Sequence, residues 1–377
     1  MLSDEGKENM RKKKVLFFVE AMGGGVFTYI TNLANGLSED FDVYVAYAVR
    51  KQTPINYKDY FNKNVHLIKV NSFTRQISIH DIKAFFEIKK ICKNVNPDII
   101  HLHSSKAGVL GRWAFNGKNI PVFYTPHGYS FLMSNINPFK KKLYRFVEFI
   151  SAKRNCTTIS CSVGENRETQ KLTSRAFHVD NGINVKDIDA VLNNQDSNKN
   201  KSKVVFTIGR ISTQKGPKVF NKIAESLPNT KFVWIGNGEL RSQLTSPNIE
   251  VTGWKNRSEA LKLASKYGIF LLTSKWEGLP ISLLESMCMK KVCVVSNVSG
   301  NNNVIVNKEN GYLCNSIDDY VNAIKRILVD TPNNIVNSAY NDIMTHYNSN
   351  IMVKEYANIY REKLWKIKSK NKSQNLN

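Results

Sequence analysis

The sequence predicts an α/β protein with two doubly wound parallel-sheet domains that face each other across a cleft. Short apolar runs alternate with helical patterns in two successive series, and a polar stretch separates the series. A chain of 377 residues is long enough for two domains, each with its own core. Because parallel sheets bind ligands at the carboxyl ends of their strands, we expect a site in the cleft between the domains.

The first domain is predicted over residues 14–186, after a polar and disordered tail of residues 1–13. Its first strand, 13–21, passes through three glycines into an amphipathic helix. Helical patterns, such as that of residues 82–94, separate the other strand candidates, which are 41–48, 64–70, 98–103, 121–125 and 157–162. This alternation predicts a Rossmann-like parallel sheet.

Residues 187–202 are rich in Asn, Asp, Ser and Lys and are predicted to be the linker. The second Rossmann-like domain is predicted over residues 203–350, with strand candidates at 203–210, 231–236, 249–253, 268–274, 291–296 and 311–314. Residues 351–377 are expected to form a long amphipathic helix and a polar tail, with the option of crossing back to the first domain.

The composition points to anionic partners. The formal net charge is +23, from 54 basic and 31 acidic residues, which suits nucleic acid, a membrane surface or phosphorylated substrates. The six cysteines show no C-x2-C metal spacing, and no signal peptide is recognisable, so we expect reduced thiols in a cytoplasmic chain. No apolar run approaches the roughly 18 residues of a transmembrane helix.

The stretch WEGLPISLLES, residues 276–286, follows a buried strand and enters a helix predicted near 281–289. Glu277 lies in the turn and Glu285 in the helix. Helix N-termini hold phosphates, and carboxylates accept hydrogen bonds from sugar hydroxyls, so the stretch suits a sugar-phosphate site. Taken alone, the pair is better explained as a turn residue and a solvated helix residue.

Three further loops follow strands of the second domain: GRISTQKG, WIGNGEL and VTGW. The first carries Arg210 and Lys215, and a guanidinium with an ammonium in one turn suits a diphosphate. In the first domain, Gly23 to Gly25 let the backbone approach a phosphate, although they do not match the G-x-G-x-x-G dinucleotide motif. Exposed basic residues or tight turns explain each loop separately, but their fixed order at strand ends favours a ligand site.

With these motifs, the chain resembles the retaining, nucleotide-sugar-dependent glycosyltransferases of family 4, which have the GT-B fold. The resemblance runs from Lys14 to about Lys368. Besides the loops of the second domain, it includes GGGVFTYI, HLHSSKAG, TPHGYSF and DNGIN in the first. HLHSSKAG and HGYSF are typical of members that build bacterial capsule, exopolysaccharide or O-antigen.

The resemblance implies a role for each motif residue. Arg210 and Lys215 would bind the donor diphosphate and stabilise the leaving nucleotide. Glu285 would accept hydrogen bonds from the ribose, Glu277 would contact the donor sugar, and His127 would lie near the primary hydroxyl of that sugar. The remaining donor-binding residues implied are Gly24, Gly25, Gly236, Asn237, Gly238, Gly253, Trp254, Gly278, Leu279, Pro280 and Ile281.

One position departs from the family pattern. Phe27 stands where many members carry an acidic residue after the glycine loop, which leaves the acceptor contacts on this side open. The implied chemistry is front-face retention, in which Arg210 and Lys215 stabilise the leaving charge and the departing phosphate oxygen takes the proton of the acceptor.

We expect no required metal or other cofactor. Asp40 and Asp42 match the Asp-x-Asp of metal-dependent transferases, but they open a strand far from its cleft end. His101 and His103, in a strand of the first domain, are expected to be core or cleft histidines rather than metal ligands.

The segment from Phe139 to Arg154 has one apolar helical face and a crowd of lysines and arginines on the rest. Such helices dock on anionic membranes, and a core-packed helix with a solvated basic face fits the pattern equally well. A lipid-linked acceptor would make membrane attachment useful, so we expect the chain at the inner face of the cytoplasmic membrane.

The sequence therefore predicts a hexosyl- or N-acetylhexosaminyltransferase. We expect it to move a sugar from a nucleotide donor, with UDP as the first choice, to a lipid-linked or glycan acceptor in bacterial surface polysaccharide synthesis. A sugar-nucleotide epimerase also uses two such domains, but it would lack the paired glutamates and the glycine loop. A nucleic-acid-binding protein would explain the charge, yet the basic residues are spread out and no nucleic-acid motif appears, so we expect no such partner.

Overall fold

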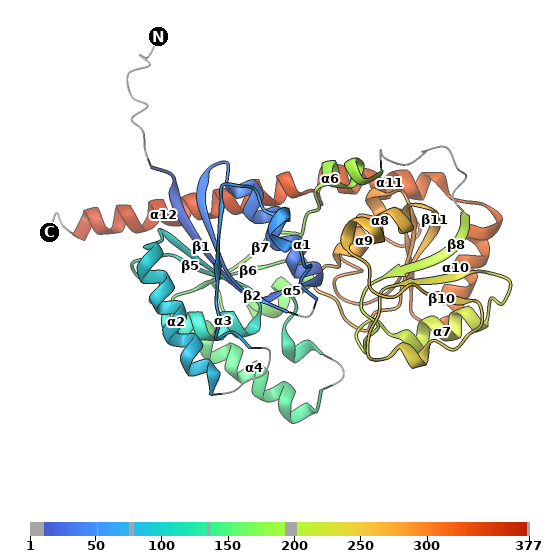
Figure 1. The fold of residues 1–377 in the computed structure, drawn as a ribbon, viewed down its shortest axis with the longest axis horizontal. Helices are drawn as coiled ribbons and strands as arrows, with labels where there is room; N and C mark the ends of the chain where they lie inside the picture. The colour runs from blue at the N-terminus through green and yellow to red at the C-terminus, as the bar shows by residue number, and fades with distance from the viewer. Residues whose placement is uncertain (1–10, 51, 75–78, 134–135, 193–201, 375–377) are drawn as a thin grey trace, which may run out of the picture.

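The structure, a computed structural model, describes residues 11–50, 52–74, 79–133, 136–192 and 202–374. Two α/β domains lie side by side, and a long C-terminal helix runs along the first of them (Figure 1). Of the predicted disordered tail, residues 1–10 fall outside the described residues, and the first strand begins at Lys13.

The N-terminal domain is built on a seven-stranded, fully parallel sheet with the strand order β3-β2-β1-β4-β5-β6-β7. Its strands are β1 (Lys13–Met22), β2 (Phe41–Val49), β3 (Val65–Lys69), β4 (Ile99–His103), β5 (Val122–Thr125), β6 (Thr157–Ser160) and β7 (Ala176–His178). Six of them match predicted strands. β7 was not predicted because it is short and partly exposed at the sheet edge, so its sequence carries no apolar run.

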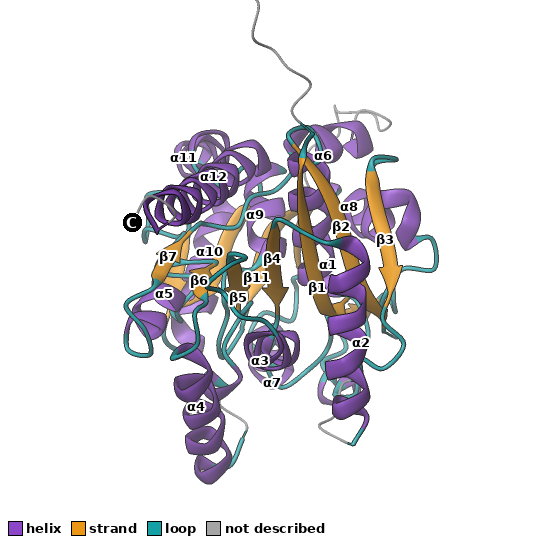
Figure 2. Ribbon diagram, turned by 90° about the vertical axis from the view of Figure 1, so that its left-hand side faces the viewer, coloured by secondary structure: helices purple, strands orange, loops and turns teal. Residues whose placement is uncertain are grey.

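Helices cover both faces of this sheet (Figure 2). They are α1 (Gly24–Leu37), α2 (His80–Val95), α3 (Ser105–Ala114), α4 (Pro138–Ala152) and α5 (Val163–Gln170), with short 3-10 turns η1 (Tyr57–Tyr60) and η2 (Ser130–Leu132). Alternate residues of β1 point to opposite faces, so one core forms beneath α1 and the C-terminal helix and another beneath α2 and α3. β1 is buried on both sides, as a central parallel strand requires.

The C-terminal domain has a six-stranded parallel sheet with the order β10-β9-β8-β11-β12-β13. Its strands are β8 (Ser202–Ile208), β9 (Phe232–Ile235), β10 (Ile249–Val251), β11 (Tyr267–Leu272), β12 (Val292–Ser296) and β13 (Tyr312–Cys314). Its helices are α7 (Pro217–Glu225), α8 (Arg257–Ser265), α9 (Ile281–Cys288), α10 (Ile317–Val329) and α11 (Asn333–Thr345), with a 3-10 turn η3 (Arg241–Gln243). Separate apolar clusters fill the space on the two faces of the sheet.

The predicted linker of residues 187–202 is not irregular throughout. Helix α6 (Val185–Leu192) occupies its first part and packs on the C-terminal domain, where the side chain of Ile188 is fully buried. Because most residues of this stretch are polar, the sequence does not show the short apolar contact that the helix makes. Residues 193–201 lie outside the described residues, and β8 starts at Ser202.

Helix α12 (Ser349–Gln374) leaves the C-terminal domain and returns along the N-terminal one (Figure 1). Tyr356 and Tyr360 are fully buried in the core beneath α1. The Tyr29 hydroxyl donates to the Tyr356 hydroxyl at 2.6 Å, and the Tyr360 hydroxyl is hydrogen-bonded to Nδ1 of His101. The C-terminal helix is therefore part of the first domain's core.

Candidate active site

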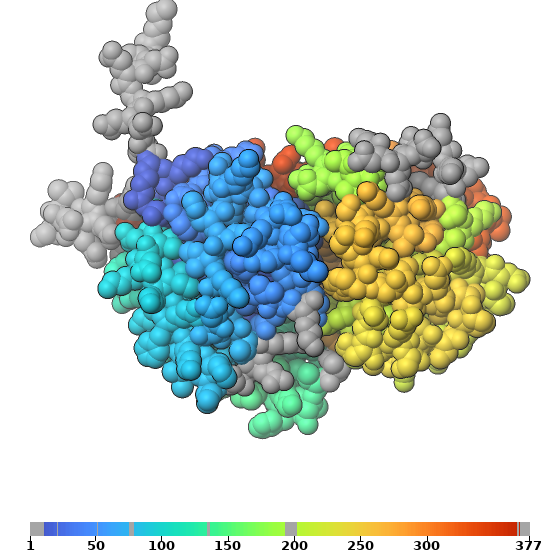
Figure 3. Space-filling model, in the orientation of Figure 1, coloured from blue at the N-terminus to red at the C-terminus, as the bar shows by residue number. Residues whose placement is uncertain are grey.

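A cavity of about 880 Å³ lies between the domains, which meet along a narrow line on the face shown in Figure 3. Its walls come from the segments that follow β1, β2, β5, β6 and β7 in the N-terminal domain and β8, β9, β10 and β11 in the C-terminal domain. All of these are carboxyl ends of parallel strands, where backbone N–H groups of the following helices are available to a ligand.

Two helix N-termini meet across this cavity. The first turns of α1 and α9 are close enough that a Cβ atom placed on Gly25 would lie 3.6 Å from Cγ1 of Ile281. Neither helix has a side-chain N-cap or an acidic residue in its first turn. Gly24 has a φ of +57°, in the left-handed region that favours glycine. The uncapped amides and the partial positive charge of both helix ends make this part of the cavity a site for an anion.

Lys215 and Glu277 form an ion pair at the edge of the cavity. Nζ of Lys215 lies 2.7 Å from Oε1 of Glu277, whose side chain is only 7% exposed. The same carboxylate accepts hydrogen bonds from Ser274 Oγ at 2.6 Å and from Gln214 Nε2 at 3.3 Å. Glu277 is therefore held in one orientation before any ligand arrives, and Lys215 is drawn to the cavity wall.

The turn that carries Lys215 is fixed by β11. The hydroxyl of Thr273 donates to the carbonyl of Lys215 at 2.8 Å. Gly216, which precedes α7, has a φ of +65°, and a Cβ atom there would lie 2.3 Å from the carbonyl oxygen of Thr273. A glycine is required at this position by both the backbone conformation and the space.

Arg210 lies at the end of β8 and lines the cavity. In the ranges that the structure describes, its guanidinium has no hydrogen-bond or ion-pair partner. The preceding residue is held by Trp234, whose Nε1 donates to the carbonyl of Gly209 at 2.8 Å. A fixed backbone with a free guanidinium is an arrangement suited to a diphosphate.

Glu285 is paired with a residue that sequence reasoning missed. Nε of Arg257, the first residue of α8, lies 2.8 Å from Oε1 of Glu285, and the side chains are 19% and 8% exposed. Nη2 of Arg257 is buried and has no hydrogen-bond partner among the described residues. The sequence pattern that could have pointed to Arg257 is the Asn256–Glu259 capping box, which marks the start of a helix directly after the VTGW loop.

His127 projects from the loop after β5 and lines the cavity. Its φ of +56° is in the left-handed region, and burial lowers the pKa of its ring to about 3. Nε2 of His127 lies 3.2 Å from Nδ1 of His103, which is fully buried in β4. The ring is therefore neutral at ordinary pH, so it can act as a hydrogen-bonding group but carries no charge.

A second missed residue, Glu165, supports the His127 loop from beneath. One oxygen of its buried carboxylate accepts from Gly128 N at 2.6 Å, and the other accepts from Cys161 N at 2.8 Å. Burial raises the pKa of this carboxyl above its ordinary value. The local sequence Ser162-x-x-Glu165 marks the start of a helix, but it does not show that the carboxylate reaches Gly128, which follows another strand.

The remaining predicted donor-binding residues divide into two groups. The cavity lining includes Gly24, Gly25, Gly236, Trp254, Gly278, Leu279, Pro280 and Ile281. Asn237, Gly238 and Gly253 lie outside the lining. Asn237 is used structurally, since its carbonyl accepts from Ile211 N at 3.0 Å and its side chain accepts from Gly238 N at 2.9 Å. Donor contacts by this second group stay a prediction.

Within the described ranges, no group of three or more His, Cys, Asp or Glu side chains is placed to hold a metal ion. Both aspartates of the Asp-x-Asp motif have structural partners at the amino end of β2. Asp42 accepts from the Tyr44 hydroxyl and lies 3.0 Å from Nε2 of His66, and Asp40 pairs with Arg361 of α12. Reaction without a metal stays a prediction.

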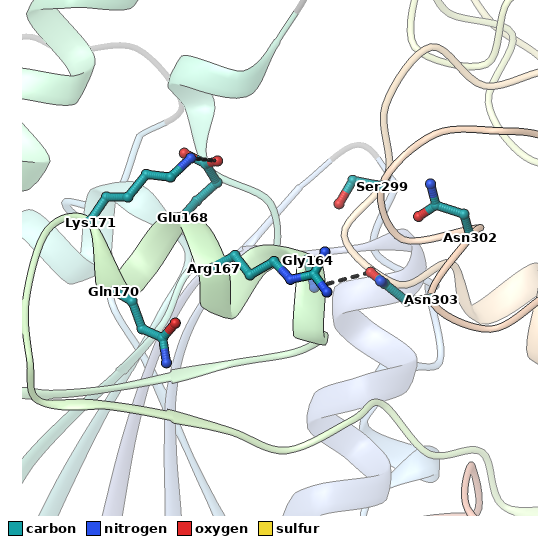
Figure 4. A pocket seen from close by; sticks show the side chains of 8 residues that line it. All are labelled: Gly164, Arg167, Glu168, Gln170, Lys171, Ser299, Asn302 and Asn303. Carbon is teal, nitrogen blue, oxygen red and sulfur yellow. Dashed lines mark hydrogen bonds and ion pairs between the residues drawn. The ribbon is translucent and has the colours of Figure 1, made fainter.

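A second hollow lies where α5 meets residues 299–303 of the C-terminal domain (Figure 4). Gly164 N donates to the side chain of Asn303 at 3.1 Å, and a Cβ atom on Gly164 would lie 2.2 Å from Ser299 Oγ. Lys171 and Glu168 are ion-paired with each other at its rim (Figure 4). The two domains are in direct contact at this hollow, which lies next to the main cavity.

Comparison with known proteins identifies the family. Residues 23–187 match the model described as Glycosyltransferase Family 4, and residues 159–342 match that of glycosyl transferases group 1. A galactosyltransferase from Escherichia coli, named for transfer from UDP-Gal to α-D-GlcNAc-diphosphoundecaprenol, is 31% identical over 86% of this chain and 89% of the relative. The chain belongs to the family 4 glycosyltransferases.

Other relatives extend this glycosyltransferase assignment. An N-acetylgalactosaminyltransferase of Campylobacter jejuni that acts on a diphospho-undecaprenol-linked sugar is 25% identical over 74% of this chain and 81% of its own. Sucrose-phosphate synthase from Thermosynechococcus elongatus superposes with a TM-score of 0.76, at 16% identity, over 93% of this chain and 99% of that one. HepE of Anabaena, solved with UDP-glucose, gives 0.72 at 15% identity over 93% and 99%. These structures confirm the predicted GT-B fold, and the family replaces the alternative of an epimerase.

The apolar face of the basic helix α4 is exposed. Phe139, Leu143 and Phe146 are 74%, 47% and 58% exposed, whereas the buried residues of the helix are Glu148, Ser151 and Ala152. Figure 2 shows α4 projecting from the body of the N-terminal domain. Among the described helices, none is both long and apolar enough to cross a membrane.

Proposed function

We propose that this glycosyltransferase transfers a sugar from a UDP-sugar, with retention, to a lipid-linked saccharide in the synthesis of a bacterial surface polysaccharide. The observation that carries the proposal is the convergence of two uncapped helix N-termini with Arg210 and Lys215 in one cavity that Glu277 and Glu285 flank. The names of the relatives support the class of substrate, since those from E. coli and C. jejuni act on diphosphoundecaprenol-linked sugars and HepE binds UDP-glucose.

The charges in the cavity suit this substrate. The cavity lining carries four cationic side chains, Arg210, Lys215, Lys255 and Arg257, and three carboxylates, Glu259, Glu277 and Glu285, before the donor binds. Binding of the donor diphosphate changes the net charge of the cavity from positive to negative. The amides of α1 and α9 add partial positive charge where the phosphates would lie. As the bond to the sugar breaks, negative charge grows on the departing phosphate, and these fixed groups stabilise it without reorganising.

In the proposed mechanism, no side chain acts as a general acid. The departing phosphate oxygen takes the proton of the acceptor hydroxyl on the same face of the sugar, and the new bond forms on that face. Glu277 is held by three partners and orients the sugar through its hydroxyls. His127, which is neutral, contributes a hydrogen bond and does not transfer a proton.

Arg210 offers the cleanest test of the catalytic role. Because it has no partner among the described residues, Arg210→Ala should leave stability unchanged while turnover falls by about 10²- to 10³-fold, as for loss of one transition-state donor. Arg241→Ala is a matched control, since Arg241 is an exposed arginine of the same domain outside the cavity. Near-normal turnover of Arg210→Ala would end the assignment.

Thermal unfolding in the presence of nucleotides tests the donor base. UDP at 100 times its dissociation constant should stabilise the protein by about 2.7 kcal/mol, and GDP and ADP at the same concentration should have much smaller effects. A larger shift with GDP or ADP would replace UDP in the proposal. Tight binding of nucleic acid at physiological salt, in a gel shift that weakens as salt is raised, would revive the class of protein that the sequence disfavours.

We also propose that the exposed face of α4 docks on the anionic inner surface of the cytoplasmic membrane, where a lipid-linked acceptor would lie. Apolar side chains at its surface are flanked by Lys140, Lys142 and Arg145, the combination that interfacial helices use. Phe139→Ser with Phe146→Ser should abolish co-sedimentation with anionic vesicles. Trp365→Ser, on the exposed surface of α12, should not change it. Equal binding of both variants would contradict the proposal.

A further inference from the structure

His103 has an unusual environment for an imidazole. The side chain is fully buried at the carboxyl end of β4, with the ring of Phe17 at 4.9 Å and that of His101 at 4.0 Å between centroids. One ring nitrogen, Nδ1, lies 3.2 Å from Nε2 of His127. The other, Nε2, is buried and has no hydrogen-bond partner among the described residues. The mechanism proposed above does not use His103.

The position of one proton follows from these contacts. Burial lowers the pKa of both rings well below the ordinary range, so each ring is neutral and carries one N–H. If Nε2 of His103 carried its proton, a buried N–H would have no acceptor, which is destabilising. If Nδ1 carries the proton instead, it donates to Nε2 of His127 and leaves only a lone pair without a partner. A buried N–H group without an acceptor is rarer in proteins than a buried lone pair without a donor. The arrangement with the proton on Nδ1 is therefore favoured.

The same contact then sets the state of His127. Because Nε2 of His127 accepts a hydrogen bond, the proton of that ring must lie on Nδ1. Nδ1 has no partner among the described residues, and His127 lines the cavity. The left-handed backbone at His127 and the Gly128 N–H bond to Glu165 hold the loop in place. The ring therefore presents a hydrogen-bond donor rather than an acceptor.

We propose that His103 is a positioning residue that fixes His127 in the Nδ1–H tautomer, so that His127 donates a hydrogen bond to an oxygen of the donor sugar. The tautomer follows from the fold alone, whereas the identity of the acceptor as a sugar oxygen rests on the function proposed above. An N–H group held in one orientation favours a ligand group that presents a lone pair to it. The group of the sugar that faces His127 is therefore a hydroxyl acting as acceptor, and an N–H group in its place is disfavoured.

The ring proton can be observed directly in the complete protein. In protein labelled with ¹⁵N-histidine, long-range ¹H–¹⁵N correlation spectra distinguish the two neutral tautomers, and His127→Gln identifies the signals of His127. We expect the Nδ1–H form for both His103 and His127 in the unliganded wild type. A predominant Nε2–H form of His127 overturns the proposal, whether or not the protein transfers sugars.

Two substitutions at position 103 separate positioning from packing. His103→Leu fills the space but cannot donate, so the tautomer of His127 should become mixed and kcat should fall about tenfold with a smaller change in KM. His103→Asn places an amide N–H near the position of Nδ1 and should restore both the Nδ1–H form and most of kcat. A fall in kcat that is equal for the two variants, with the Nδ1–H form retained in each, overturns the role of His103.

Donor analogues test the ligand side of the same bond. A sugar with fluorine in place of the hydroxyl that faces His127 keeps an acceptor, whereas the deoxy sugar keeps none. Fluorine also slows bond breaking by withdrawing electrons, but this effect is the same in every variant. We expect the ratio of the fluoro rate to the deoxy rate to be higher with the wild type than with His127→Ala. An equal ratio in the two proteins overturns the contact with the sugar while leaving the tautomer decided by the spectra. Absence of all sugar transfer would count against the proposed function alone.

Discussion

Replacing Arg257 with methionine removes the positive charge beside Glu285 but keeps a flexible apolar stem. The carboxylate of Glu285 is 8% exposed, and Arg257 is its ion-pair partner. Breaking a fully buried pair from one side costs about 3–5 kcal/mol. Because Arg257 is 19% exposed, water can reach part of the site, and we expect a loss of about 2–3 kcal/mol. At roughly 2–4 °C per kcal/mol for a unit of about 150 residues, the Tm of the C-terminal domain should fall by about 4–12 °C.

The double variant Arg257→Met with Glu285→Gln separates stability from donor recognition. Without either charge, no buried ion is left unpaired, so stability should return to within about 1 kcal/mol of the wild type. The KM for the donor should stay raised, because the proposed contact of Glu285 with the ribose is lost. Stability is followed by urea unfolding of the complete chain, and KM by initial rates with the nucleotide sugar.

A surface pair supplies the control. Lys231 and Glu250 lie 2.6 Å apart but are each about half exposed, so Lys231→Met should change the free energy of unfolding by no more than about 0.5 kcal/mol. The reasoning is refuted if Arg257→Met is as stable as the wild type, or if the double variant is as unstable as the single one. Either result would mean that Glu285 is not held as a buried carboxylate.

Three further outcomes are expected. The free energy of unfolding should fall as pH drops from 6.5 to 5.5, by up to about 1.4 kcal/mol per pH unit for His127 and for each histidine of β4. The reason is that the unfolded chain binds protons in this range, whereas the low pKa of these rings keeps them neutral in the folded protein. His178, whose pKa a carboxylate raises, acts in the opposite direction, and a free energy from urea unfolding that does not change with pH would contradict this account. Gly216→Ala should lose about 2 kcal/mol or more by urea unfolding and most turnover, because its Cβ would meet the Thr273 carbonyl; full stability would show that the turn can shift. Dialysis against EDTA should leave turnover unchanged, and restoration of a lost activity by Mg²⁺ or Mn²⁺ would contradict the metal-free mechanism.

Much of the fold was predictable because parallel strands in the centre of a sheet are apolar on both faces. β1 and β11 contain uninterrupted apolar runs, and the glycine-containing turns after β1, β8 and β9 mark strand ends. The edge strand β7 has no buried side chain, and the helix α6 has one, Ile188. Elements of that kind are stabilised by their neighbours rather than by their own pattern, so they were missed.

The candidate site was predictable loop by loop but not contact by contact. Motif order brought Lys215 and Glu277 into one cavity, yet nothing local shows that they pair across 62 residues of chain. Arg257, Glu165 and His103 were not singled out as site residues, because each acts on a motif residue from a different strand end. Such roles depend on the packing of the finished fold, which residue types and spacing do not encode.

The return of α12 to the N-terminal domain has a consequence for how the chain is made. During synthesis the first domain leaves the ribosome early, but Tyr356 and Tyr360, which fill its core, are added only after the whole C-terminal domain. Until then, the surface beneath α1 that receives them stays open to water. The first half of the enzyme to be synthesised is thus the last to be completed, and a chain that stops before Ser349 would leave an unfinished domain for proteases to find.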